Sequence, residues 1–155
     1  MKKVLKITLV GLLILSFMSA CSSSAKPKSI TCDQMISFDT TKPDPHWIGT
    51  LTGCELEGTV EYWETDLNFT VHQIEHFYET FKITTEKGVI TGVDNGDWDL
   101  TTFEFTADGW VKDAKGDWAY LRGYKFHETG TTTKVPLPAG TTVISGSSTM
   151  SLTAP

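Results

Sequence analysis

Short stretches in which apolar and polar residues alternate run through the chain from Ile30 onward, and they constrain its fold more than any other feature. In one of them, Phe77, Phe81 and Ile83 fall on one face together with Glu79. Alternation with a period of two is typical of a β-strand, because successive side chains point to opposite faces. Several such stretches at short spacing predict an all-β fold: a single closed antiparallel barrel of about eight strands, with a β-sandwich as the alternative.

Glycine-containing pairs separate these stretches and indicate turns between strands. The pairs are Lys87-Gly88, Asn95-Gly96, Asp108-Gly109 and Lys115-Gly116. The longest expected strand then covers residues 118–128. One of its faces carries an aromatic-rich set with a single cation: Trp118, Tyr120, Arg122, Tyr124 and Phe126. Inside a barrel this face would line a cavity, whereas outside it would bind a partner or cover the N-terminal segment.

The N-terminal segment has the pattern of a secretory signal. Three lysines within the first six residues precede an apolar run over residues 7–18. A basic start followed by a short apolar run is typical of an export signal, and the run is shorter than the about 20 residues that a membrane-spanning helix needs. We expect residues 1–20 to be removed, residues 21–29 to form a flexible tether and residues 30–155 to form the barrel domain.

The apolar run ends in Met18-Ser19-Ala20-Cys21, which resembles the lipobox of bacterial lipoproteins. Met18 stands where leucine is usual. The resemblance implies cleavage before Cys21, a diacylglycerol thioether on its sulfur and a further acyl chain, such as palmitate, on the new N-terminus. Two or more acyl chains give stable attachment to membrane lipid. The protein is therefore expected in the bacterial cell envelope, and Ser22 indicates the outer membrane, facing the periplasm or the surface, if the cell is Gram-negative.

Cys32 and Cys54 remain as an even pair once Cys21 is assigned to lipid. Disulfides persist in the oxidising compartments that exported proteins enter. The loop that this pair would close spans 54 − 32 = 22 positions, for which chain entropy gives a stabilisation of roughly 3 kcal/mol. Two lone cysteines lack the CxxC spacing of a zinc site, so we expect a disulfide.

The charge balance argues against one class of partner. The chain has 13 Lys and Arg against 19 Asp and Glu, and three of the lysines belong to the signal, which leaves 10 − 19 = −9. An acidic surface repels phosphate backbones, and no basic aromatic-rich patch is present, so no nucleic-acid partner is expected. The 155 − 20 = 135 residues that remain after cleavage are enough for one domain with a sizeable core.

Two short motifs contain residue types that bind metals. The sequence from His72 to His76, with Glu75 between them, matches a zinc pattern that requires both imidazoles on one helix. Its neighbours favour a strand, in which two such histidines lie roughly 13 Å apart. The acidic segment from Asp94 to Asp99 lacks the ligand spacing of a calcium loop and is more typical of a turn. Since nucleophile-elbow, phosphate-loop and dinucleotide motifs are also missing, we expect no catalytic, metal-binding or cofactor-binding residue.

One block over about residues 77–130 resembles the allene oxide cyclase and dirigent-like barrel superfamily. Its shared positions include Phe81, Ile83, Gly88, Ile90, Gly92, Asp94, Gly96, Trp98, Phe105, Gly109, Val111, Gly116, Leu121 and Gly123. The resemblance implies an eight-stranded antiparallel barrel with a central cavity, and the plant members act on or steer hydrophobic small molecules. No catalytic residue of those enzymes carries over by motif. A lipocalin-type barrel is the competing assignment, although its opening Gly-x-Trp is reversed here as Trp47-Ile48-Gly49.

These features together predict an envelope lipoprotein whose barrel binds a small hydrophobic ligand or a protein partner without catalysis. A cofactor-free cyclase or isomerase that uses the same cavity is the first alternative. A structural or inhibitory envelope protein with a filled barrel is the second. The barrel interior distinguishes them, because an apolar cavity favours the binder, ionisable groups in a wet cavity favour the enzyme, and a filled interior favours the structural protein.

Overall fold

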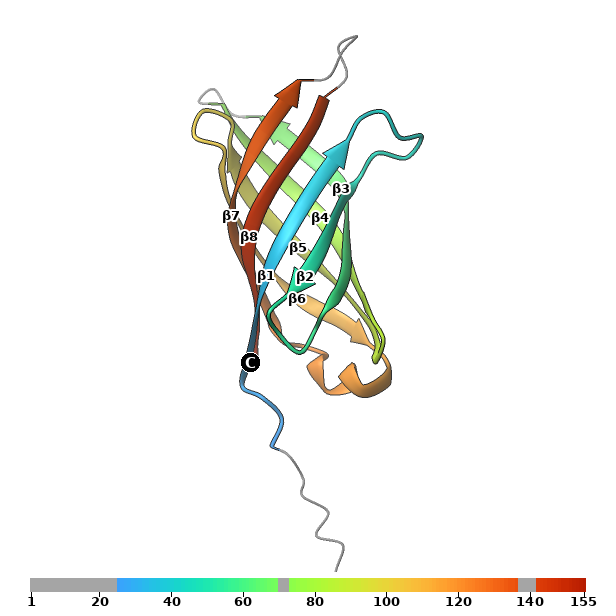
Figure 1. The fold of residues 1–155 in the computed structure, drawn as a ribbon. Coiled ribbons are helices and arrows are strands. Elements are labelled where there is room, and N and C mark those ends of the chain that lie inside the picture. Colours follow the sequence, from blue (N-terminus) through green and yellow to red (C-terminus); the bar gives the residue numbers. More distant parts are fainter. Residues whose placement is uncertain (1–24, 70–72, 137–141) are drawn as a thin grey trace, which may run out of the picture.

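The computed structural model describes residues 25–69, 73–136 and 142–155, and these form a closed barrel (Figure 1). Each strand pairs antiparallel with the next one in the sequence, and the last pairs with the first. The strands are β1 (Ser29–Asp39), β2 (Trp47–Thr52), β3 (Gly58–Phe69), β4 (Ile74–Thr85), β5 (Gly88–Asp99), β6 (Glu104–Ala114), β7 (Lys125–Pro136) and β8 (Thr142–Thr153). The predicted all-β fold, a single closed antiparallel barrel of eight strands, is confirmed.

Closure of the barrel runs along the whole of its first and last strands. In the register of β1 with β8, Ser29 lies opposite Thr153 and Asp39 lies opposite Val143. Every strand therefore has two hydrogen-bonded neighbours, which leaves no sheet edge open to pairing with another chain. This continuous closure rules out the sandwich alternative, in which two separate sheets face each other.

Alternation along the strands separates an interior from an outer surface. On β4 the buried side chains are Phe77, Glu79, Phe81 and Ile83, the same face that the sequence pattern predicts. On β1, buried and exposed residues alternate strictly from Ser29 to Ser37. The interior of the barrel is therefore built from every second residue of each strand, as the strand period requires.

One end of the barrel, called the closed end below, is covered by the short 3₁₀-helix η1 (Gly116–Leu121). Its residues Trp118 and Leu121 are buried, and the Trp118 indole Nε1 donates to Thr85 Oγ1 at 2.7 Å. Gly116 has φ +68°, a left-handed conformation that glycine adopts without strain, and this turns the chain from β6 into η1. No helix in the described part of the chain is long and apolar enough to cross a membrane.

The strand expected over residues 118–128 is therefore wrong in its first half. Residues up to Leu121 belong to η1, and β7 begins only at Lys125. The large rings that alternate in the sequence fit a short helix equally well, because Trp118 and Leu121 lie one 3₁₀ turn apart and reach the same side. Arg122 points outward and pairs with Asp113.

Two of the expected turns are also wrong, since Asn95-Gly96 lies inside β5 and Asp108-Gly109 lies inside β6. The absence of a side chain at Gly96 is instead needed for packing inside the barrel. A Cβ placed on it would lie 2.2 Å from the main-chain oxygen of Thr106 and 2.5 Å from Phe77 Cζ. The glycine thus makes room for a ring in the barrel interior, which its sequence context does not distinguish from a turn.

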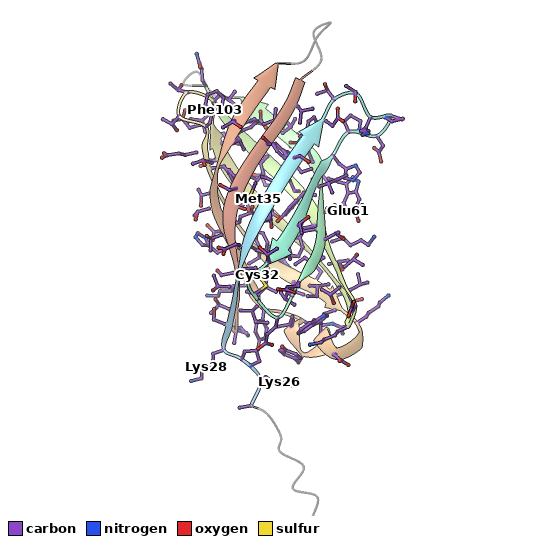
Figure 2. The ribbon with its side chains drawn as sticks, in the orientation of Figure 1. Lys26, Lys28, Cys32, Met35, Glu61 and Phe103 are labelled. Carbon is purple, nitrogen blue, oxygen red and sulfur yellow. A yellow bond between two sulfur atoms is a disulfide. The ribbon has the colours of Figure 1, made fainter. Side chains whose placement is uncertain are left out.

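The N-terminal segment leaves the barrel at the closed end, where the predicted disulfide is also found (Figure 2). Cys32 and Cys54 are bridged, which ties β1 to the segment after β2. The Tyr124 hydroxyl donates to the Pro27 carbonyl at 3.0 Å, and Lys26 Nζ lies 5.3 Å from the centre of the Tyr120 ring. Part of the aromatic set predicted from the sequence therefore covers the incoming chain rather than lining a cavity.

Candidate functional site

The barrel interior changes character along its axis. Toward the closed end it is filled by apolar side chains, with the Phe81 and Phe126 rings stacked at 4.7 Å between their centres. The largest of the fully buried side chains are Phe81, Phe126, Leu51, Leu56, Ile83, Ile90, Leu121, Met150 and Leu152. Dense packing of this kind leaves no room for a ligand in that half. Any interior site must lie in the other half, called the pocket end below.

The pocket end contains a cavity of about 40 Å³, which is room for a few water molecules or one small chemical group. Aromatic rings form most of its wall: Trp47, Tyr62, Phe77, Trp98 and Phe105. Four carboxyl groups also line it: Glu64, Glu75, Glu79 and Glu128. The combination of apolar walls with a few polar groups is typical of small-molecule sites.

Two of the tryptophans that line this cavity contact each other. The Trp47 and Trp98 rings meet edge to face, with 6.0 Å between their centres, an arrangement that aromatic pairs prefer. The Trp47 indole Nε1 donates to Glu64 Oε1 at 3.2 Å. The Trp98 indole Nε1 is buried and has no hydrogen-bond partner among the described residues. A buried N–H group without an acceptor is costly, so this group needs water or a ligand atom.

A hydrogen-bonded cluster crosses the middle of the barrel. Glu128 Oε1 accepts from the Gln34 amide at 3.0 Å, and Glu128 Oε2 lies 2.9 Å from the Tyr62 hydroxyl. The same hydroxyl lies 2.9 Å from Gln34 Oε1. One phenol proton cannot serve both acceptors fully. Burial raises the pKa of Glu128, and burial together with the neighbouring Glu128 charge raises the pKa of Tyr62.

A second acidic pair lies beside this cluster. Glu79 and Asp94 are cross-strand partners on β4 and β5, and both are buried. Burial, reinforced by the charge of Glu128, raises the pKa of Asp94 to about 8, and burial, reinforced by Asp94, raises the pKa of Glu79 well above its ordinary value. The protonated form of Glu79 donates to Asp94, and among the described residues no other donor reaches the carboxyl oxygens of Asp94. The pair is therefore stable only when a proton or another cation is shared between the two groups.

The remaining acids lie nearer the pocket end. Desolvation raises the pKa of Glu64, and desolvation with the Glu64 charge raises the pKa of Glu75. Together with the central groups they make five acidic side chains in or beside the cavity, whose pKa values all shift upward. Four of them are buried, namely Glu75, Glu79, Asp94 and Glu128, and Glu64 is more exposed. Among the described residues that line the cavity, none is basic. Among the side chains that the structure describes, the interior thus has many hydrogen-bond acceptors and no basic group.

The two motifs that contain metal-binding residue types do not bring these side chains together in the structure. In the zinc-like motif, Glu75 points into the barrel, whereas His76 lies on the outer surface beside Asp97, and His72 lies outside the described residues. The acidic segment from Asp94 is part of β5, so its side chains alternate between the two faces. Within the described ranges, no group of three or more His, Cys, Asp or Glu side chains is arranged to hold a metal ion.

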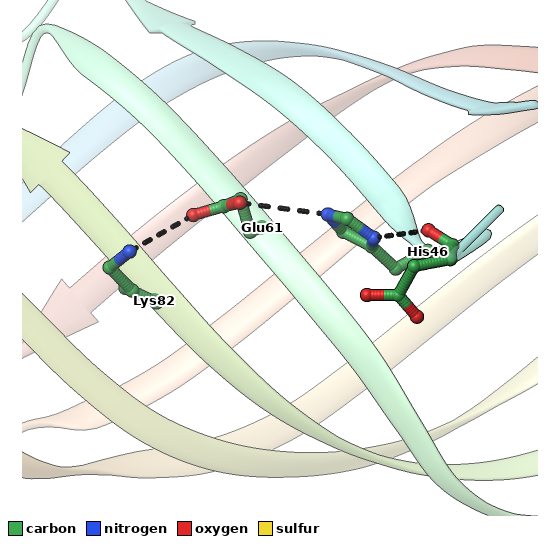
Figure 3. A network of polar contacts seen from close by, with 4 residues as sticks. His46, Glu61 and Lys82 are labelled. Carbon is green, nitrogen blue, oxygen red and sulfur yellow. Dashed lines mark hydrogen bonds and ion pairs between the residues drawn. The ribbon is translucent and has the colours of Figure 1, made fainter. Parts of the chain in front are cut away.

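Two further polar clusters on the outer surface do not line the interior cavity. Figure 3 shows Glu61 between His46 and Lys82, with Glu61 oxygens 3.6 Å from His46 Nε2 and 3.2 Å from Lys82 Nζ. On another part of the surface, Asp108 Oδ1 lies 2.8 Å from His127 Nδ1. The hydroxyl of the adjacent Ser151 donates to the His127 main-chain carbonyl, so these groups are not arranged as a nucleophile and its base.

None of the interior acids was predicted from the sequence as a site. Cys21, the expected lipidation site, lies outside the described residues. One signal was available for Glu79, which falls on the same alternating face as Phe77 and Phe81. Glu128 follows Phe126 on β7 in the same way. An acidic residue on a face of large apolar residues is the pattern that marks a buried carboxyl, because exposed acids normally fall on the other face.

Comparison with known proteins gives no further assignment. No protein-family model matches the chain, and neither a curated protein nor a solved structure matches it.

Proposed function

We propose that the barrel binds a small molecule through the cavity at its pocket end and does so without catalysis. The observation that supports this most directly is the cavity itself, whose lining combines five aromatic residues with four carboxyl groups. The cavity takes one small group of the ligand, and the rest of the molecule extends toward the barrel end. A small hydrophobic body fits the aromatic wall.

We further propose that Cys21 carries lipid and attaches the barrel to the membrane of a bacterial envelope, as its lipobox-like context suggests. The five steps along the chain from Cys21 to Lys26 can span at most about 18 Å. The described chain enters at the closed end, and Figure 2 places Lys26 at the opposite end of the barrel from Phe103. The cavity then faces away from the membrane, where soluble molecules reach it. The eight-stranded barrel is compatible with the resemblance to allene oxide cyclase and dirigent-like proteins, and lipocalin-type barrels share the same strand order.

Native mass spectrometry of the protein isolated from its own cells tests the binding proposal. We expect a retained small molecule that is released when the protein unfolds. Ala107 is buried and lines the cavity, so Ala107→Phe fills it and should abolish retention. Ala119→Phe is the matched control, since Ala119 is exposed on η1. Equal retention by both variants would place the ligand elsewhere and contradict the proposal.

One observation favours a second candidate, a cofactor-free cyclase or isomerase. The pKa of Asp94 is raised to about 8 beside the cavity-lining Glu79, and general acid–base catalysis works best with groups whose pKa lies near the operating pH. If this candidate is correct, the retained molecule changes structure when it is incubated with fresh protein, and Glu79→Gln stops the conversion without releasing the molecule. An unchanged molecule supports the binder.

A further inference from the structure

The interior acids define what kind of group the cavity can accept. Ionised carboxylates are acceptors only, and among the described residues the donor that reaches Asp94 is the protonated form of Glu79. Asp94 is 4 % exposed, and Glu79 is 8 % exposed. A buried carboxylate without a donor or a counter-charge is strongly unfavourable. A cation that donates hydrogen bonds can take the place of the proton that Glu79 and Asp94 share.

We propose that the ligand is a protonated primary amine whose ammonium group enters the cavity toward Glu79 and Glu128, with an apolar or aromatic body against Trp47 and Trp98. This inference rests on the proposed binding function and specifies its ligand class. An ammonium group has three donors for the acceptors on the cavity floor. The aromatic wall adds a favourable cation–π contribution.

Other cations match the site less well. A divalent metal ion needs several oxygen ligands around one point, and the described residues contain no group arranged in that way. A quaternary ammonium ion suits an aromatic wall but donates no hydrogen bond, so it leaves the carboxylates unpaired. A neutral alcohol can donate one hydrogen bond but brings no charge, so the carboxyl groups keep their protons.

Binding of the amine is coupled to proton release. The ionisable groups that face the cavity or its floor are Tyr62 and Glu64 from β3, Glu75 and Glu79 from β4, Asp94 from β5 and Glu128 from β7. All of the carboxyl groups hold protons to a higher pH than usual. An ammonium ion stabilises their ionised form and displaces protons, so affinity should increase as pH rises from 5 to 8.

Titration calorimetry with two matched probes tests this inference. Phenethylamine and 2-phenylethanol share a body and differ in the amine and hydroxyl group. We expect the protonated amine to bind at least tenfold more tightly at pH 7.5 and to release protons, measured as a dependence of the binding heat on the buffer. Equal affinity for the two probes would support the pocket but overturn the amine. Failure of both probes to bind would overturn the amine and the proposed function together.

Two variants locate the ammonium group. Glu79→Gln removes a cavity carboxyl and should weaken phenethylamine binding at least tenfold while leaving the binding of 2-phenylethanol within a factor of two. Glu61→Gln removes a carboxyl from the outer surface and should change the affinity for neither probe. Thermal unfolding of each variant establishes that it is folded at the temperature of the titration. Unchanged amine affinity in folded Glu79→Gln would overturn the proposal.

Discussion

Glu79 on β4 and Asp94 on β5 lie directly opposite each other in the sheet, and both point into the barrel. Two carboxyl groups placed together in this way cannot both ionise without a partner. The pair sits next to a cavity that is otherwise lined by rings and further acids. This relationship links the stability of the barrel to pH and to what enters the cavity.

The first prediction concerns stability and pH. Folding raises the pKa of Asp94 from its ordinary value of 3.8 to about 8. Between these pH values the native state binds a proton that the unfolded state releases. The contribution of Asp94 to the free energy of unfolding is therefore highest below pH 4 and falls as pH rises toward 8. Asp94→Asn should make this fall shallower and raise the free energy of unfolding at pH 8 by at least ~1 kcal/mol. Urea denaturation of the variant and the wild type at several pH values measures this difference in the free energy of unfolding.

Asp108→Asn is the control for this series, because Asp108 is exposed on the outer surface. It should leave the pH dependence unchanged. An Asp94→Asn variant that follows the wild-type curve at every pH would show that Asp94 is not a buried protonated acid.

The second prediction concerns the bridge between Cys32 and Cys54. The loop between them is 22 residues in sequence separation, so a variant with both cysteines changed to alanine should lose roughly 3 kcal/mol of unfolding free energy. Wild-type protein treated with reductant should lose a similar amount, and the double variant should not respond to reductant. A wild-type thermal midpoint that reductant leaves unchanged would argue against the bridge.

The third prediction tests whether Asn95-Gly96 is strand or turn. Gly96→Val places carbon atoms against the Thr106 carbonyl and the Phe77 ring, and such overpacking should cost roughly 1–3 kcal/mol. Asn95→Val points outward from the same strand and should cost much less. If the pair were a type I′ turn, both residues would need positive φ, and valine at Asn95 would be costly as well. Denaturant midpoints of the two variants decide between these outcomes.

The fourth prediction concerns the anchor. Cys21→Ala should abolish incorporation of labelled fatty acid and leave the signal uncleaved, because the thioether forms on that sulfur. Ser22→Ala keeps the cysteine and should retain both the label and the cleavage. Labelling that persists without Cys21 would refute the lipoprotein assignment.

The barrel itself was predictable because period-two alternation survives in most of the strands, for example in the face shared by Phe77 and Ile83. The pairing of Cys32 with Cys54 was predictable from the parity of the cysteines. The path of the chain around Trp118 was not predictable, because a 3₁₀-helix and a strand can both bury large apolar residues that are spaced as they are there. The prediction of a turn at Gly96 was wrong for a similar reason, since a glycine that makes room for a ring distant in sequence has no local signature.

The acidic interior could be foreseen only in part. Glu79 lies on a predicted apolar face, but its encounter with Asp94 depends on the register of β4 with β5, which is set by the whole sheet. Tyr62, Gln34 and Glu128 come from β3, β1 and β7, and only barrel closure brings them within hydrogen-bonding distance. Contacts between residues so distant in sequence do not follow from local patterns.

The most direct test of the small-molecule site follows the five tryptophan indole N–H signals by NMR while phenethylamine is added. Trp47 and Trp98 line the cavity, whereas Trp110 is exposed and Trp118 is buried at the closed end. We expect the Trp98 and Trp47 signals to shift and saturate together, while those of Trp110 and Trp118 stay in place. A Trp98 signal that does not move, or a shift confined to Trp110, would contradict a ligand site inside the barrel.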